Sequence, residues 1–437
     1  MTFLTPRSIL GILIITLLAV VPSQVMAADG GTLDSGNTSW ILTSTALVLF
    51  MTMPGLALFY AGLVSAKNVL SVLMHCFAIT CTVSVLWVVF VYGLAFGDGG
   101  SANMVIGGFD KAFFRGVGFD GMSGDIPESV FFMFQMTFAI ITPALIVGAY
   151  PERMKFTAVL MFSALWVIIV YAPVCHWVWG GGFLAALGVM DFAGGLVVHT
   201  TAGVSALVVV AMLGSRKGAP QDDRPAHNPG MTMAGTAMLW VGWIGFNAGS
   251  ALAADGSAGM ALLVTHVSAA TAALTWMFVQ WLHRGKPSLV GIATGTIAGL
   301  ATITPAAGFV GPIGALIIGL AAGLVCYPMC HIVRQLLKLD DSLDVFAVHG
   351  VGGMLGIMLT SVLASAVFGG VGFGPESSVL HQLWVQAVGV GVTAVWAGVM
   401  TAIILIFVKK VTGLRVSESE ETKGLDMAHH GERGYNL

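Results

Sequence analysis

The sequence predicts an all-α protein that crosses a membrane eleven times. Of its 437 residues, 57% are hydrophobic and only 9% are charged, whereas a water-soluble domain needs more charge to solvate its surface. Apolar runs of roughly eighteen or more residues recur along the chain, which is typical of transmembrane helices. Glycines and prolines inside these runs are compatible with this reading, because neighbouring membrane helices satisfy the freed backbone groups.

The first expected element is a signal peptide over residues 1–27. Arg7 precedes an apolar stretch from Ile9 to Val21, which is followed by Pro22 and a small-residue site ending at Ala27. A positive start, a short apolar core and a cleavable site are typical of a secretory signal. The alternative is an uncleaved first helix. Cleavage after Ala27 would leave the mature N-terminus outside the cytoplasm.

The expected membrane domain covers residues 28–410 and a cytoplasmic tail covers 411–437. The domain divides into a first repeat of five spans (about 39–213), a second repeat (about 231–367) and an eleventh helix (about 384–408). In order, the spans are 39–65, 70–96, 129–150, 156–178, 192–213, 231–251, 258–282, 289–304, 309–330, 345–367 and 384–408.

The basic residues predict the orientation. With the N-terminus outside, eleven spans place the C-terminus inside, and only Lys111 and Arg115 of the mature chain are external. The loop that holds them is also acidic. Cytoplasmic loops are enriched in lysine and arginine, so this distribution supports the topology. The basic residues expected inside are Lys67, Arg153, Lys155, Arg216, Lys217, Arg224, Arg284, Lys286, Arg334, Lys338, Lys409, Lys410, Arg415, Lys423 and Arg433.

The two halves resemble each other. The FYAG segment at 59–62 in span one matches FNAG at 246–249 in span six, and a Val-His pair ends at His199 in span five and at His349 in span ten. Because each half has an odd number of spans, the second copy is inverted in the membrane. Inverted repeats with a site at their interface are typical of transporters.

His199 and His349 are the ionisable residues that stand out within the spans, where such groups are costly and usually functional. His199 lies about 12 Å in from one face and His349 about 7–8 Å in from the other, at 1.5 Å per residue. We expect the imidazoles to meet near the midplane. A neutral imidazole has one donor and one acceptor, so a pair can share a proton and still bind a small uncharged polar solute. The alternative is two unrelated histidines that pack between helices.

Two aspartates precede these histidines. Asp191 is expected to cap the N-terminus of span five, and a negative potential near the outer mouth that attracts a cation is a compatible second role. Asp344 is expected to cap span ten, with no role toward substrate.

Aromatic residues provide candidate cation contacts. Phe134 and Phe138 are one turn apart in span three and share a face, and aromatic faces bind cations with about 0.5–2 kcal/mol each. Phe134, Trp179 and the Ser250 hydroxyl could replace part of the hydration of a small cation. Phe138 and Phe246 below them could exclude water. The alternative is ordinary lipid-facing or interfacial aromatics.

No cofactor and no metal are expected. Cys326, Cys330 and His331 have a spacing that a metal site could use, but small thiols that pack in the core explain the pattern better. The five cysteines, all in or beside apolar spans, are Cys76, Cys81, Cys175, Cys326 and Cys330.

Several long motifs resemble the ammonium transporter (Amt/Mep) family. They are DFAGG at 191–195 followed by VVH at 197–199, GFNAGS at 245–250, DVFAVHG at 344–350 and GLDMAHHG at 424–431. The resemblance extends over nearly the whole mature chain. The related Rhesus-type channels typically lack the tryptophan and serine of the outer site, so Trp179 and Ser250 indicate the Amt branch.

The resemblance implies a bacterial inner-membrane transporter of ammonium, with methylammonium as an analogue, and not an enzyme. It implies a homotrimer with one pore per subunit, and a PII-type regulatory protein that can dock on the inner loops and tail; no nucleic-acid partner is expected. The implied residues are Phe134, Trp179 and Ser250 at the outer recruitment site, Asp191 structuring that site, Phe138 and Phe246 at the gate with Trp243 nearby, and His199 and His349 in the pore.

The hypothesis that follows is that ammonium loses its proton near the phenyl gate and that ammonia crosses past the histidines. Either the proton stays outside, or it is relayed separately through Asp191 and the imidazoles. Two other functions are weighed. A redox subunit with histidine-ligated haem is disfavoured because the other histidines are scattered and no haem motif occurs. An autonomous ammonium sensor is disfavoured because the chain ends soon after the last span.

Overall fold

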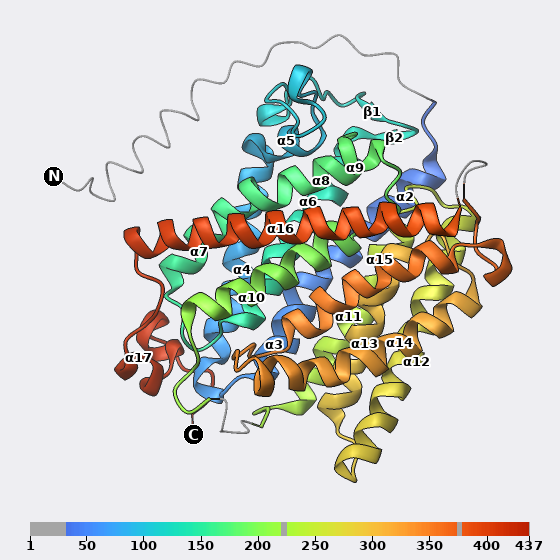
Figure 1. The fold of residues 1–437 in the computed structure, drawn as a ribbon. Helices are drawn as coiled ribbons and strands as arrows, with labels where there is room; N and C mark the ends of the chain where they lie inside the picture. The colour runs from blue at the N-terminus through green and yellow to red at the C-terminus, as the bar shows by residue number, and fades with distance from the viewer. Residues whose placement is uncertain (1–31, 220–224, 374–377, 437) are drawn as a thin grey trace, which may run out of the picture.

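The computed structural model describes residues 32–219, 225–373 and 378–436, and these form a bundle of long helices (Figure 1). Within the described residues, ten helices are long and apolar enough to cross a membrane. An eleventh by length is α11 (Pro229–Gly249), with 21 residues. The predicted all-α membrane fold with eleven helices is therefore confirmed. The expected signal peptide, 1–27, lies outside the described residues.

Several of the first five spans contain a π-helical turn, in which the backbone bonds are formed one residue further along than in an α-helix. Span one is α2 (Ser35–Phe50), η1 (Met51–Leu56) and α3 (Ala57–Leu63); span two is α4 (Val69–Leu86), η3 (Trp87–Val91) and α5 (Tyr92–Phe96); span three is α6 (Glu128–Ile146) with η6 (Val147–Ala149); span four is α7 (Phe156–Trp166), η7 (Val167–Tyr171) and α8 (Ala172–Trp179); span five is η8 (Gly195–Thr200) and α10 (Thr201–Leu213).

Among the remaining spans, nine and ten contain a π-helical turn. Span six is α11; span seven is α12 (Gly256–Arg284); span eight is α13 (Leu289–Ile303); span nine is α14 (Pro312–His331) with η10 (Ile332–Leu336); span ten is η11 (Phe346–Val351) and α15 (Gly352–Leu363); span eleven is α16 (Val379–Val411). Outside the spans are a hairpin of β1 (Met122–Ser123) and β2 (Ile126–Pro127), the short helix α9 (Phe183–Ala186), and the tail elements α17 (Glu418–Lys423) and η13 (Asp426–His430).

Burial separates central from peripheral helices. Nearly all residues of α6 are buried, whereas most apolar side chains of the long helix α16 are exposed or partly exposed. In Figure 1, α16 runs across the bundle over α7 and α10. A helix that is apolar all round and exposed is one that faces lipid, and one that is apolar and enclosed lies at the centre of the bundle. Span three therefore lies at the centre of the bundle, where it can contribute side chains to an interior site.

Spans five and ten cross at contacts between glycines. A Cβ atom added to Gly203 would lie 2.2 Å from the Cα atom of Gly350, and one added to Gly353 would lie 2.6 Å from the Cβ atom of His199. Small residues allow helix backbones to approach this closely in membranes. The crossing fixes the relative position of the two histidine-bearing helices.

On the face that carries the tail, buried ion pairs join the loops between spans. Arg153, fully buried, donates to Asp340 Oδ2 at 3.2 Å and to Ser342 Oγ at 2.7 Å. Arg216 pairs with Asp340 at 2.9 Å and with Glu152 at 3.2 Å. Burial raises the pKa of Asp340, but the Arg216 hydrogen bonds and the Arg153 charge outweigh it and leave that pKa below its usual range. The carboxylate is thus held ionised between two guanidinium groups.

Candidate functional site

Two aromatic side chains and a hydroxyl gather where α8 and α11 end beside α6, and we call them the outer group because the sequence predicts that they face outside. Phe134, from α6, is buried against the end of α11, where a Cβ atom on Gly249 would lie 3.0 Å from Phe134 Cε2. The next residue, Ser250, donates its hydroxyl hydrogen to the carbonyl of Phe246 at 2.8 Å. A hydroxyl that donates in this way keeps its oxygen lone pairs to accept from another donor. Trp179 is half-buried, and its Nε1 donates to the Asp191 carbonyl at 3.0 Å, which orients the indole.

Asp191 is the cap that the sequence predicts for span five. Its carboxylate accepts from the backbone amides of Gly194, Gly195, Leu196 and Val197, at 2.9, 2.6, 2.7 and 3.3 Å. Burial raises the pKa of Asp191 and the four amide bonds oppose that shift, with a net increase. Both carboxylate oxygens are engaged with the backbone, so Asp191 acts on the outer group by holding η8 and the loop beneath Trp179.

Two phenyl rings stack next to the outer group. The ring centroids of Phe138 and Phe246 are 4.3 Å apart at an interplanar angle of 34°. Both side chains are almost completely buried. The ring of Trp179 stands nearly perpendicular to that of Phe138, at 5.8 Å and 88°. Rings at van der Waals separation leave no room for a hydrated ion without a side-chain movement.

The two histidines meet beneath the rings. The Nδ1 atoms of His199 and His349 are 3.3 Å apart, and the imidazoles stack with centroids 5.2 Å apart at 22°. Each histidine lies in the π-helical turn that starts its span, η8 or η11. Trp243 stacks on His199 at 5.5 Å. The His199 Nε2 atom has no hydrogen-bond partner within the described residues, so it can bind a polar solute.

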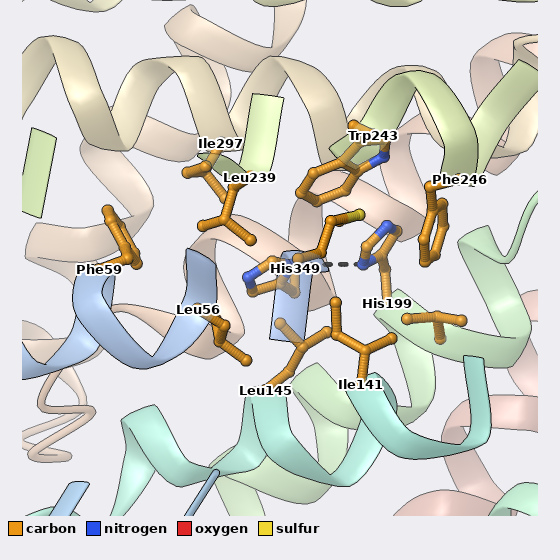
Figure 2. Close-up of a pocket in the computed structure, with 12 residues that line it drawn as sticks. Leu56, Phe59, Ile141, Leu145, His199, Leu239, Trp243, Phe246, Ile297 and His349 are labelled. Atoms are coloured by element: carbon orange, nitrogen blue, oxygen red, sulfur yellow. Dashed lines mark hydrogen bonds between the residues drawn. The ribbon is translucent and has the colours of Figure 1, made fainter. Parts of the chain in front are cut away.

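A narrow cavity runs beside the imidazoles (Figure 2). Its volume is about 10 Å³, close to the least that can hold one water molecule. Apart from the two histidines the lining side chains are apolar, with the Trp243 indole nitrogen occupied by a 2.8 Å hydrogen bond to Thr304 Oγ1. The lining residues are Met51, Leu56, Phe59, Ile141, Leu145, Val198, His199, Leu239, Trp243, Phe246, Ile297 and His349.

The cap of span ten is Asp341, so the prediction that Asp344 caps it is wrong. Asp341 Oδ2 accepts from the Phe346 amide at 2.8 Å, whereas Asp344 has a left-handed backbone (φ 59°) and pairs with Arg334. Burial, assisted by the nearby Asp344 charge, raises the pKa of Asp341 to about 7. Asp341 precedes His349 by the same interval that separates Asp191 from His199. Aligning the two histidines would have identified this aspartate.

Sequence reasoning also missed the residues that support the pair. Gly203 and Gly353 each follow a histidine by four residues, and each packs against the backbone or Cβ atom of the opposite histidine's turn. Thr304 anchors Trp243. The equal glycine spacing was a readable signal, but no local feature of the sequence marks Thr304.

The candidate metal spacing does not converge in the structure. Cys326 and Cys330 are buried and His331 is exposed. Across the described ranges, no group of three or more histidine, cysteine, aspartate or glutamate side chains is placed to hold a metal ion.

Comparison with known proteins agrees with this geometry. The sequence model of the Ammonium Transporter Family matches residues 39–435. An ammonium transporter of Aquifex aeolicus is 46% identical over 423 residues, covering 95% of this chain and 97% of its own. One from Bacillus subtilis is 45% identical over 410 residues, covering 92% and 99%.

The fold is also similar to solved structures of Amt and Mep proteins. The structure titled "Sensor Amt Protein" has a TM-score of 0.84 at 30% identity and covers 90% of this chain and 98% of its own. The crystal structure of Saccharomyces cerevisiae Mep2 has a TM-score of 0.81 at 33% identity and covers 88% of both chains. The chain described here, with paired imidazoles beneath stacked phenyl rings, belongs to the ammonium transporter family.

Proposed function

We propose that this chain transports ammonium across a membrane by binding the ion outside, removing its proton and conducting ammonia past His199 and His349. The observation that carries the proposal is the 3.3 Å contact between the two imidazoles beside a small cavity with mostly apolar walls. The cavity admits a molecule the size of water and offers it hydrogen bonds only at the imidazoles. The family membership and the names of the relatives support ammonium as the substrate.

The outer group binds the cation. The faces of Phe134 and Trp179 attract a positive charge with about 0.5–2 kcal/mol each, more where water is excluded. The free lone pairs of Ser250 Oγ accept one N–H bond from ammonium. These contacts replace part of the hydration shell, while Asp191 holds the loop beneath Trp179 in place.

The phenyl gate requires loss of charge. An ion moved into the apolar passage beyond Phe138 and Phe246 would lose its hydration and gain no counter-charge, which costs several kcal/mol or more. Ammonium escapes this cost by releasing a proton, and potassium, similar in size, has none to release. Selectivity for ammonium over potassium then follows from the ability of ammonium to lose a proton and not from pore diameter.

The imidazole pair receives the ammonia. With Nδ1 facing Nδ1, one ring donates and the other accepts, so the Nε2 atoms of the two rings differ in protonation. His199 Nε2 therefore offers either a donor or an acceptor to the solute. These roles interchange only when the shared proton crosses between the Nδ1 atoms while the accepting ring gives up its Nε2 proton and the donating ring gains one at its own Nε2. The proton released at the gate either remains outside or follows a separate relay through Asp191 and the imidazoles.

Transport is tested by uptake of ammonium or methylammonium into proteoliposomes, with and without pH and voltage gradients. We expect uptake that His199→Ala reduces strongly and that His266→Ala, which removes an exposed imidazole on α12, leaves unchanged. A lack of uptake by the folded wild-type protein would refute the proposal and favour a sensor with little transport.

Electrical recording on the same liposomes tests the relay. An ammonium-evoked current that disappears in His199→Ala supports proton transfer through the imidazoles. An undiminished, ammonium-selective current in that variant would contradict it.

The proposal extends to location and assembly. The protein is a homotrimer with one pore per subunit in a bacterial inner membrane, its signal peptide (1–27) is removed, and its tail (411–437) is cytoplasmic. The basic loops gather on the tail side, where Lys155 donates to the Thr412 carbonyl at 3.2 Å and Arg415 pairs with Glu421, and this agrees with the positive-inside rule. That face is also where a PII-type regulatory protein docks. Labelling of single cysteines in the tail of intact cells tests the orientation, and external labelling would contradict it.

A further inference from the structure

A second cavity lies where the tail crosses the start of span two. Its volume is about 280 Å³, and its walls include Lys67, Lys423, Asp426, Arg433 and Tyr435. In Figure 1 the tail element α17 lies near the end of the bundle at which the C-terminus is marked. This cavity is open to solvent on one side, because Lys67, Lys423 and Arg433 are exposed.

The tail is held firmly at this place. Asp426 accepts from the backbone amides of Leu70 and Ser71 at 3.1 and 2.7 Å, which caps the first turn of α4. The Leu425 amide donates to Asn68 Oδ1 at 2.7 Å. Further on, a Cβ atom on Gly434 would lie 2.4 Å from a methyl group of Val69, so the chain lies directly on the helix start. The tail side of the cavity is therefore held in position by specific contacts with the start of α4.

Positive charge exceeds negative charge in this cavity. Lys67 uses one hydrogen on the Thr422 carbonyl at 2.7 Å and keeps two donors. Among the described residues, no carboxylate forms an ion pair with Lys423 or Arg433. The Asp426 carboxylate is already occupied by two amides. Three cations thus face a single, engaged carboxylate.

We propose that this cavity binds the phosphate group of a phosphate ester, supplied either by a soluble metabolite or by a phospholipid headgroup. Arginine and lysine donors that line one cavity, and that form no ion pair within the described residues, match the several acceptor oxygens of a phosphate. The space is large enough for the phosphate and part of the esterified group, against which Met427 and Tyr435 offer apolar surface. Tyr435 is kept in place by a 3.0 Å hydrogen bond between its hydroxyl and His227 Nε2. Occupation would fasten the segment that holds Arg433 to the segment that holds Lys67.

The test uses the full-length protein in neutral detergent at constant ionic strength. Glycerol 3-phosphate is the soluble probe, and dioctanoyl phosphatidic acid, with dioctanoyl phosphatidylcholine as reference, is the lipid probe. Calorimetric titration gives the dissociation constants. The double variant Lys423→Gln/Arg433→Gln removes two of the cations, and Lys409→Gln/Lys410→Gln, at the exposed end of α16, is the matched control.

We expect the Lys423/Arg433 variant to weaken binding at least about tenfold, because each charge-assisted hydrogen bond contributes substantially, and the control to bind as the wild type does. Binding of both probes assigns the site to soluble esters as well as lipids, and binding of phosphatidic acid alone assigns it to a headgroup. Absence of binding by both, or equal weakening in the two variants, would overturn the proposal. If the variant does not fold, saturating probe on the wild type must slow tryptic cleavage after Lys423 and Arg433 but not after Arg284; unchanged cleavage would overturn it equally.

Discussion

Replacement of Gly203 by alanine should separate the two imidazoles without altering either one. The new Cβ atom would lie 2.2 Å from Gly350 Cα, and ordinary contact begins at 3.4 Å, so span ten must retreat by about 1.2 Å. Overpacking of this kind costs about 1–3 kcal/mol. The Nδ1 atoms of His199 and His349, now 3.3 Å apart, would move toward or beyond about 4 Å, which is outside hydrogen-bond reach.

The measurement is methylammonium uptake into proteoliposomes at matched protein content. Loss of about 1.4 kcal/mol of hydrogen bonding at the pair corresponds to an uptake rate lower by about tenfold. Gly398→Ala is the control, since its Cβ atom would lie 3.5 Å from Val204 Cγ1, an ordinary contact between α16 and α10. Equal uptake by Gly203→Ala and Gly398→Ala, with both proteins folded, would refute the reasoning.

Three further substitutions test other parts of the site. Ser250→Ala should raise the ammonium concentration for half-maximal uptake by about tenfold with little change in maximal rate, because a hydrogen bond to a charged donor is lost; the exposed Ser257→Ala is the control, and an unchanged half-saturation would count against the outer site. Thr304→Val should lower the free energy of unfolding by about 1–3 kcal/mol by leaving the buried Trp243 N–H unsatisfied, and equal thermal stability of this variant and the wild type would contradict that. Asp341→Asn should flatten the pH dependence of thermal stability. Because the folded-state pKa of Asp341 is raised from 3.8 to about 7, its stabilising contribution is complete below pH ~4 and is lost as the pH rises through ~7; melting curves from pH 4 to 8 with identical slopes in both proteins would exclude this role.

The prediction of spans from composition succeeded because hydropathy is a local property. The expected span 129–150 corresponds to α6 with η6 (Glu128–Ala149) and the expected span 258–282 to α12 (Gly256–Arg284). Each residue contributes its own transfer free energy whatever its neighbours are, so a window of sequence contains the information needed. The observed helix ends differ from the expected ends by a few residues, because capping contacts and not hydropathy determine where a helix ends.

The meeting of the histidines was predictable from the repeat, whereas choosing the aspartate nearest to the histidine gave the wrong cap for span ten. An inverted repeat brings equivalent residues together at its axis, and His199 and His349 obey this. The aspartate nearest to His349, Asp344, was the wrong choice, because its left-handed backbone turns it toward Arg334. Asp341, three residues earlier, reaches the first amides of span ten.

From the sequence alone followed the membrane class, the number of helices, the repeat and the identity of the paired histidines. Orientation and the signal peptide stay predictions. Only the tertiary structure decided the 3.3 Å separation of the imidazoles, the stacking of Phe138 on Phe246, and the contacts of Gly203 and Thr304. The reason is that partition into a membrane depends on each residue separately, whereas interhelical distance and rotation depend on contacts between side chains far apart in the chain.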